Sequence, residues 1–380
     1  MTTRPPLDYP FAWPSATGQP EELATVHRCP VQPVTLPSGD EALLLTRYED
    51  IRALLADPRV SKDRNRPGMA RMTAKKDKVF QKKVPARPGG HARVRKLINK
   101  EFTAARVEKL RPRIAEIADG LLDAMAAQGG PVDLNEAYAF PLTVQVICEL
   151  LGVPAADREQ FGDTSAPPWD YMRELIAAKR EQPGDDLISD LIAVRDEDDG
   201  RLTDDELHWW CTLLLLAGYE TTASQLSGGT VLLLTHDGQL EKLRADWSLM
   251  PRAVEELLRL QVVGSSLSML RYVTEDIDLN GTHIAQGSSI IPALEAGNTD
   301  GEAFACPADL DISRSGPRQL TFSTGRHFCL GAPLARVELQ VGIERLLRRF
   351  PDLRLAACPQ HLRRKDDAFF QSFEEVPVTW

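Results

Sequence analysis

The sequence has no long apolar run. None of its 380 residues lie in a stretch of about 18 consecutive apolar side chains, the length that a membrane-spanning helix needs. Prolines interrupt the N-terminus, which also lacks the apolar segment of a signal peptide. We therefore expect no membrane span and a cytoplasmic location.

Cysteine is scarce, and basic residues are outnumbered. The chain has six cysteines, none of them in a CxxC pair, so neither a disulfide framework nor a structural zinc site is expected. It carries 45 Lys and Arg against 55 Asp and Glu, a net charge of −10. This acidic balance argues against a general nucleic-acid-binding protein.

Most of the chain has the apolar spacing of helices. Helices are predicted over residues 47–56, 92–102, 105–128 and 142–151, and strands over 42–46 and 277–279, the last followed by the hairpin signal Asn280-Gly281. No repeat or linker-like stretch divides the sequence. We expect one mainly α domain with small β-sheets over residues 1–380.

The longest predicted helix runs from Asp204 to about residue 236. Thr203 and Glu206 have the spacing of a capping box at its start, and Asp237-Gly238 is predicted to mark its end. Its first half is apolar on all sides, as in a core helix. The polar residues within 217–222 (AGYETT) follow that run, and burying them unpaired would cost several kcal/mol. They form either a solvent-facing stripe or a functional site.

A second unusual segment is residues 322–338, FSTGRHFCLGAPLARVE. It presents Cys329 on a loop with two glycines, directly before a predicted helix. The free N–H groups of a helix N-terminus favour a thiolate. Such a cysteine is a nucleophile, a metal ligand or simply a buried thiol, and the residues alone leave these alternatives open.

The spaced pattern F-x-x-G-x-H-x-C-x-G-x-x-L-A-R-x-E in this segment resembles the haem-binding loop of soluble bacterial cytochrome P450 enzymes. The resemblance covers nearly the whole chain, in the family's order. Further matching segments are residues 91–95 (H-x-x-x-R), 217–222 (A-G-x-[DE]-T-T), 256–259 (E-x-x-R), 271–276 (R-x-x-T-E-D) and 307–314.

This resemblance implies the cytochrome P450 fold, with haem b between the long central helix and the helix that follows the cysteine loop. Cys329 would be the thiolate axial ligand of the iron. Glu220 and Thr221 would deliver protons to oxygen, and Glu256, Arg259 and Arg314 would form a structural triad. The other residues implied in haem binding are His91, Arg95, Ala217, Arg271, Phe322, Gly325, His327 and Gly331.

The resemblance also suggests walls for the substrate pocket: Leu213, Gly218, Val263, Gly264, Leu267, Phe369 and Phe370. Some positions depart from the family pattern. Asn298-Thr299-Asp300-Gly301 replaces the usual N-R-D-P, Leu310 replaces a common Phe, and Gly228-Gly229 interrupts the long helix.

Two stretches near the expected pocket are unusual. The region from Phe161 to Glu181, which roofs the active site in the family, looks shortened and is broken by Pro167-Pro168. We interpret this as a pocket open to a large or extended substrate; the alternative is that the remaining helices tilt inward around an ordinary pocket. Residues 64–87 are rich in Lys and Arg, which indicates either attraction of an acidic substrate or carrier, or a solvated loop.

The resemblance predicts a monooxygenase of secondary metabolism that receives electrons from a ferredoxin and its reductase and hydroxylates a small-molecule or peptide substrate. Arg93, Lys96 and Arg336 are candidates for docking an acidic ferredoxin. Oxidative coupling of aromatic rings in a large or peptide-like substrate is an alternative. A non-catalytic haem sensor is disfavoured by the presence of Glu220 and Thr221. A cysteine hydrolase using Cys329 and His327 is disfavoured because the two are only two residues apart.

Overall fold

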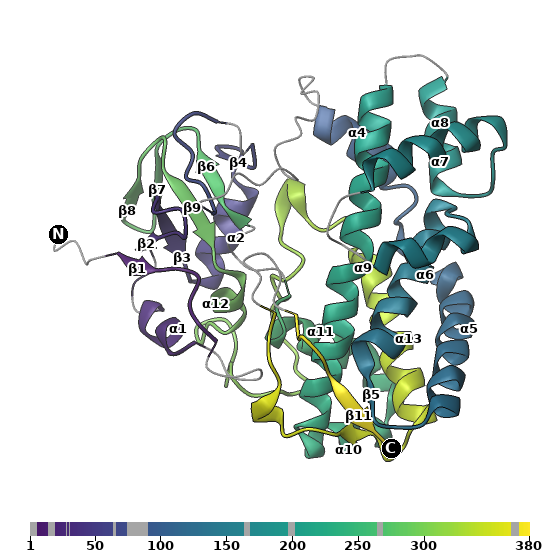
Figure 1. Cartoon of the computed structure of the whole chain (residues 1–380). Coiled ribbons are helices and arrows are strands. Elements are labelled where there is room, and N and C mark those ends of the chain that lie inside the picture. The colour runs from purple at the N-terminus through teal and green to yellow at the C-terminus, as the bar shows by residue number, and fades with distance from the viewer. Residues whose placement is uncertain are drawn as a thin grey trace. The chain divides into compact units, whose positions relative to one another are not determined.

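A computed structural model describes residues 6–13, 20–27, 29, 31–63, 66–73, 90–162, 168–196, 202–263, 269–365 and 372–380 (Figure 1). Its contacts divide the chain into two compact units. Unit 1 comprises Met1–Asp77, Ser227–Cys329 and Arg354–Pro377, and unit 2 comprises Lys78–Leu226, Leu330–Leu353 and Val378–Trp380. The division describes packing only, so one domain over residues 1–380 stays a prediction.

Unit 1 is built on a six-stranded sheet in the order β1-β2-β3-β9-β6-β4. Strand β3 is antiparallel to β2 but parallel to β9, with Leu43 opposite Ile290. The strands are β1 (Leu7–Asp8), β2 (Val31–Thr35), β3 (Glu41–Leu45), β4 (Val60–Ser61), β6 (Arg271–Val273) and β9 (Ser289–Pro292). Leu44, Ile290 and Ile291 are fully buried, which places an apolar core on this sheet.

A separate hairpin in unit 1 joins β7 (Ile277–Leu279) to β8 (Thr282–Ile284). Its turn residues Asn280 and Gly281 have φ angles of 46° and 83°, the left-handed values that an Asn-Gly turn supplies. The hairpin predicted from the sequence is therefore confirmed.

The helices of unit 1 are short. They are α1 (Glu21–Val26), α2 (Tyr48–Ala56), α10 (Asp237–Ala245), α11 (Met250–Leu260) and α12 (Leu294–Asn298), with 3-10 turns at Trp247–Leu249, Gly325–His327 and Pro359–His361. Near the C-terminus, β10 (Arg354–Leu355) is followed by β11 (Pro377–Thr379), and the Ala356 N–H donates to the Pro377 carbonyl at 2.8 Å. Helix α11 carries the E-x-x-R residues.

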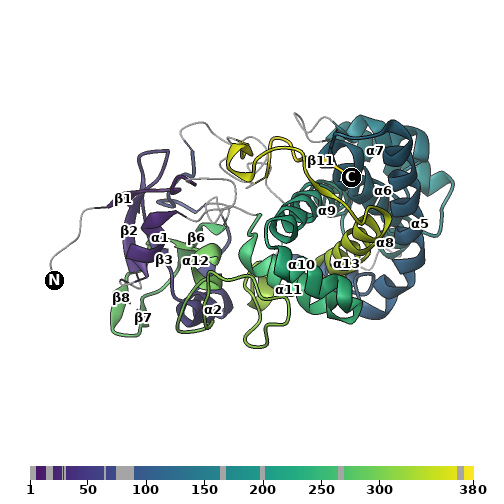
Figure 2. The ribbon, with the colours of Figure 1, turned by 90° about the horizontal axis from the view of Figure 1, so that it is seen from below.

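Unit 2 is a helical bundle (Figures 1 and 2). Its elements are α4 (Gly90–Ile98), α5 (Ala104–Gln128), β5 (Val132–Asp133), a π-helical turn (Asn135–Ala139), α6 (Phe140–Leu151), a 3-10 segment η2 (Ala155–Gly162), α7 (Trp169–Glu181), α8 (Leu187–Asp196), the greater part of α9 (Asp204–Leu234) and α13 (Ala332–Arg349). Helices α5 and α13 lie side by side, and the buried Tyr138 hydroxyl donates to the Gly342 carbonyl at 2.8 Å.

Helix α9 contains 31 residues and is about 46 Å long. The predicted capping box is present: the Glu206 N–H donates to Thr203 Oγ1 at 3.2 Å, and the Thr203 N–H donates to Glu206 Oε2 at 3.0 Å. The predicted end is wrong, because Asp237 begins α10 and α9 stops at Leu234. Among the described residues, no helix is long and apolar enough to cross a membrane.

Candidate functional site

The predicted site residues fall into two sets, one in unit 1 and one in unit 2, and each set is described by itself. In unit 1, the cysteine loop is closed on itself, because the Cys329 N–H donates to the Phe322 carbonyl at 2.8 Å. Ser323 and Gly325 have φ angles of 61° and 69°, so the loop turns through two left-handed residues. The Phe322 ring stands edge-on to the Phe328 ring at 6.5 Å. This loop leaves Cys329 partly exposed, three residues before α13 begins.

Gly325 packs against the end of α2. A Cβ at this position would lie 2.7 Å from the Leu55 carbonyl oxygen and 3.0 Å from Ala56 Cα, so no other residue fits without a shift of the backbone. Arg326 Nη2 anchors the same loop to the Val60 carbonyl at 2.6 Å. Gly325 thus allows the loop to contact α2. At Gly331, by contrast, an added Cβ would have no neighbouring atom within 4 Å.

Cys329 differs from the buried cysteines of the chain. Burial raises the pKa of both Cys148 and Cys211 to about 12, so these thiols stay protonated. Cys329 is partly exposed and lies just before the N-terminus of a helix, a position that favours a thiolate. Among the described residues, no group of three or more His, Cys, Asp or Glu could hold a metal ion.

The second set of residues lies on α9 in unit 2. Ala217 is exposed and Glu220 and Thr221 are half-buried, so one face of this otherwise buried helix is accessible. The Thr221 hydroxyl donates to the Ala217 carbonyl at 3.0 Å, and the Ser224 hydroxyl donates to the Glu220 carbonyl at 2.8 Å. The hydroxyls of Thr221 and Ser224 are thus hydrogen-bonded within the helix. These bonds explain how hydroxyl side chains can follow an apolar run without an unpaired polar group.

Gly218 packs against α6. A Cβ there would meet the Ile147 side chain at 2.6 Å. The small residue at this position therefore allows α9 and α6 to approach closely. Its expected role in the substrate pocket stays a prediction.

The expected haem-contacting cations are spread over both units. In unit 2, His91 is exposed on α4 with its ring 5.7 Å from that of Trp210, and Arg95 is half-buried one turn further on. In unit 1, Arg271 is only 2% exposed and its Nη1 donates to the Met269 and Leu270 carbonyls at 2.7 and 3.0 Å. His327 is half-buried on the cysteine loop.

Arg93 is engaged within unit 2. Its Nη2 lies 2.5 Å from Oε1 of Glu206, a carboxylate 2% exposed at the start of α9. The guanidinium therefore joins α4 to α9, and its expected contact with a redox partner stays a prediction. Lys96 on the same helix is exposed.

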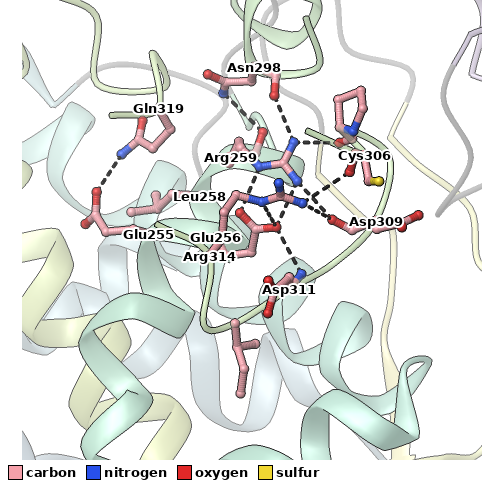
Figure 3. Close-up of polar contacts among 12 residues, drawn as sticks. Glu255, Glu256, Leu258, Arg259, Asn298, Cys306, Asp309, Asp311, Arg314 and Gln319 are labelled. Atoms are coloured by element: carbon pink, nitrogen blue, oxygen red, sulfur yellow. Dashed lines mark hydrogen bonds and ion pairs between the residues drawn. The ribbon is translucent and has the colours of Figure 1, made fainter. Parts of the chain in front are cut away.

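Glu256, Arg259 and Arg314 come together in unit 1 (Figure 3). Glu256 Oε1 accepts from Arg259 Nη2 at 2.8 Å, Arg314 Nε at 2.9 Å and the Asp311 N–H at 3.0 Å, while Oε2 accepts from Arg259 Nε at 2.8 Å. Burial alone would raise the pKa of the Glu256 carboxyl, but these hydrogen bonds hold it below its ordinary value. The carboxylate is therefore ionised inside the protein.

Asn298 extends this cluster, a role that the sequence analysis missed. Its Nδ2 donates to the Arg259 carbonyl at 3.1 Å, and its own carbonyl accepts from Arg259 Nη1 at 2.8 Å (Figure 3). Its Oδ1 accepts from the Leu320 N–H at 2.6 Å. Asn298 thus connects α11 to the segment that leads into the cysteine loop. The sequence signal for this role was the position of Asn298 at the start of the segment that replaces the family's N-R-D-P pattern.

The remaining expected pocket residues are placed only in part. Leu213 is half-buried on α9 and Val263 is buried after α11. Gly264, Leu267, Phe369 and Phe370 lie outside the described residues, as do residues 64–65 and 74–87 of the basic stretch.

Several known proteins are similar to this chain in sequence and in fold. Residues 149–359 match the family model described as Cytochrome P450. The chain is 41% identical to the cytochrome P450 monooxygenase PikC of Streptomyces venezuelae, over 92% of this chain and 88% of that protein. It is 38% identical to the nocardicin C N-oxygenase of Nocardia uniformis subsp. tsuyamanensis over the full length of both. A solved structure titled as the putative thioether synthase SgvP, involved in the tailoring step of griseoviridin, covers 99% of this chain and 100% of its own at 39% identity and a TM-score of 0.91.

Proposed function

The chain belongs to the cytochrome P450 family and is a haem-thiolate monooxygenase of the bacterial secondary-metabolism kind, and we propose that it hydroxylates a large or extended organic substrate with electrons from a ferredoxin and its reductase. The observation that carries the proposal is a partly exposed Cys329 on a closed loop three residues before α13, in a chain that also has an accessible acid and alcohol on α9.

The residues present fit a haem. Cys329 offers a thiol on a tightly closed loop, and the accessible face of α9 offers Leu213, Leu216 and Ala217, which are the apolar surfaces that a porphyrin buries. Phe322 would shield the sulfur from water. His91, Arg95, Arg271 and His327 would pair with the propionates, because forked or ring N–H donors suit carboxylates. The haem iron supplies the activation of dioxygen.

Glu220 and Thr221 would handle protons at this site. The Thr221 hydroxyl, which donates to the Ala217 carbonyl, keeps lone pairs that can accept a proton from water, and rotation of the hydroxyl passes its own proton outward. The half-buried Glu220 carboxylate would take up a proton from solvent and pass it through a water molecule to that hydroxyl. Together they move protons from solvent to the accessible face of α9.

The reductant would dock on unit 2, where the candidate contacts are Arg93, Lys96 and Arg336. Lys96 is exposed on α4, and Arg336 is half-buried on α13. Exposed cations steer an acidic protein partner at rates that fall with salt. Replacing Lys96 with Glu should therefore lower the rate of ferredoxin-dependent reduction, most strongly at low ionic strength.

The short roof supports an extended substrate. Helix α6 ends at Leu151 and α7 begins at Trp169, so 17 residues (152 to 168) connect them, and the described part is the 3-10 segment η2. The sequence analysis predicts that this stretch is shortened relative to the family, and a shorter cover would favour a ligand that reaches beyond the site.

The first test is the absorption spectrum of the reduced protein under carbon monoxide. The native protein should give the long-wavelength band typical of thiolate-ligated haem, and Cys329→Ser should lose it, while Cys358→Ser, which changes an exposed cysteine, should keep it. A native protein that binds no haem, or a C329S variant that keeps the band, would overturn the assignment.

Oxidative coupling of aromatic rings is the second candidate, favoured by the same 17-residue connection. The two reactions differ in the fate of oxygen, since hydroxylation inserts one atom of dioxygen and coupling inserts none. Mass spectrometry of the product formed under isotopically labelled dioxygen separates them.

A further inference from the structure

Helix α9 presents one continuous accessible face in unit 2. Between Leu207 and Leu226 its exposed or half-buried residues are His208, Trp209, Leu213, Leu216, Ala217, Gly218, Glu220 and Thr221. Six of these, at positions 209, 213, 216, 217, 220 and 221, have the i, i+4, i+7, i+8, i+11 and i+12 spacing of one helix face. The acid and alcohol therefore lie at one end of a mainly apolar stripe, and Trp209 lies at the other end.

We infer that Trp209 is a substrate-binding residue that stacks a planar, apolar ring of the substrate, with the oxidised atom at the opposite end of this stripe. The inference rests on the proposed monooxygenase function and names the substrate class: an elongated molecule with an aromatic or similarly flat group. At 1.5 Å per residue, Trp209 is about 12 Å along α9 from Ala217 and about 18 Å from Thr221.

The surroundings of Trp209 hold it in place. Its ring stands edge-on to Trp210 at 5.3 Å and 85°, and Trp210 is itself buried and 5.7 Å from the His91 ring of α4. A half-buried indole fixed by its neighbour binds a flat group without losing much conformational freedom. The ring is therefore a preorganised contact surface and not a loose side chain.

The neighbouring residue fixes the same part of the helix from another side. His208 Nε2 donates to the Trp169 carbonyl at 2.7 Å, and the two rings lie 5.7 Å apart. Trp169 is the first residue of α7, so this contact secures the start of α7 to α9. Arg180 near the end of α7 pairs with Asp204 of α9. The two contacts hold α7 along the first turns of α9, beside a Trp209 that stays half-exposed.

The experiment uses the haem-loaded enzyme and synthetic imidazoles. One series carries a 2-naphthyl group on alkyl tethers of increasing length, and a second carries cyclohexyl on the same tethers. The imidazole binds the iron and shifts the haem absorption, so optical titration gives a dissociation constant for each probe. The naphthyl series should bind most tightly at one tether length. At that length it should bind about two- to ten-fold more tightly than the cyclohexyl series, which is the range of an added aromatic contact.

Variants then assign that preference to a residue. Trp209→Leu should abolish the difference between naphthyl and cyclohexyl probes, and Trp209→Phe should retain most of it. Trp247→Leu, which changes a half-exposed tryptophan of unit 1, should leave all constants unchanged. The carbon monoxide band of each variant reports whether it has folded with haem.

The outcomes separate this inference from the proposed function. A native enzyme with the thiolate band but no tether optimum, or with equal affinity for the two end groups, overturns the Trp209 subsite and leaves the monooxygenase intact. A Trp209→Leu variant that keeps the naphthyl preference overturns the subsite as well. Loss of the thiolate band in the native protein would instead remove the monooxygenase itself.

Discussion

Replacing Glu256 with Gln tests the buried triad. The substitution keeps the side-chain volume but removes the negative charge that two guanidinium groups contact at 2.8 to 2.9 Å. The side chains of Glu256 and Arg259 are 3% and 2% exposed, so water cannot replace the lost charge. Breaking a buried ion pair by removing one partner costs about 3 to 5 kcal/mol of unfolding free energy, which lowers the folded-to-unfolded ratio by about two to three and a half powers of ten.

Urea titration, followed both by circular dichroism and by the haem band, measures this loss. Glu255→Gln is the matched control, because it makes the same substitution at the neighbouring carboxylate, which is half-buried and accepts from Gln319 Nε2 at 3.3 Å (Figure 3). Its cost should stay below about 1 kcal/mol. If Glu256→Gln does not fold, Arg314→Gln removes the partner that is 14% exposed and should cost about 1.5 to 3 kcal/mol.

The same triad predicts a pH dependence. Since the folded protein holds the pKa of Glu256 below its ordinary value of 4.5, the ionised carboxylate stabilises the fold fully above pH 4.5. This stabilisation declines as pH falls through the lower, folded-state pKa. The advantage of the native protein over Glu256→Gln should therefore shrink below pH 4.5. An advantage that is constant across this range, or one under about 1 kcal/mol at pH 7, would refute the reasoning.

Three further changes have distinct expected results. Gly325→Ala should lower the free energy of unfolding by about 1 to 3 kcal/mol, because the φ of Gly325 is 69° and the Leu55 carbonyl lies close to it. Gly331→Ala should leave the free energy of unfolding nearly unchanged. Equal effects of the two substitutions, measured by thermal or urea unfolding, would contradict the contact with α2. Arg93→Met should destabilise by about 1 to 3 kcal/mol by leaving the Glu206 carboxylate buried without its cation, and an unchanged unfolding midpoint would argue against the pair. Thr221→Ala should keep the carbon monoxide band but lower product formed per electron consumed by about 10- to 100-fold, with peroxide released instead; full coupling would exclude the proton role.

The sequence predicted the parts of the fold that local chemistry controls. The capping box at Thr203, the Asn280-Gly281 turn and the stop of α5 before Gly129 each depend on a few adjacent residues, and all three appear in the structure. The end of α9 was placed wrongly, because Asp237 suits the first turn of the following helix as well as a stop signal.

The sequence pattern predicted which residues belong to the candidate site, but not which residues they pack against. The spacing within residues 322–338 identified Cys329, and the spacing of Glu256 and Arg259 identified a pair on one helix face. What Gly218 and Gly325 pack against could not be read from the chain, since Ile147 and Leu55 are 71 and 270 residues away. The partner of Arg93 was equally hidden, because Glu206 lies 113 residues later.

The parallel pairing of β3 with β9 has a consequence for how the chain folds during synthesis. Leu43 lies opposite Ile290, so the two strands are separated by 247 residues (290 − 43). At about 5 to 20 residues per second, a ribosome needs about 10 to 50 seconds to make that stretch. Throughout this time the β2–β3 hairpin has emerged with one edge of β3 unpaired, and an unpaired edge accepts strands from other chains. Expression yield should therefore respond to chaperone supply and to translation rate between these strands, even for variants whose final stability is unchanged.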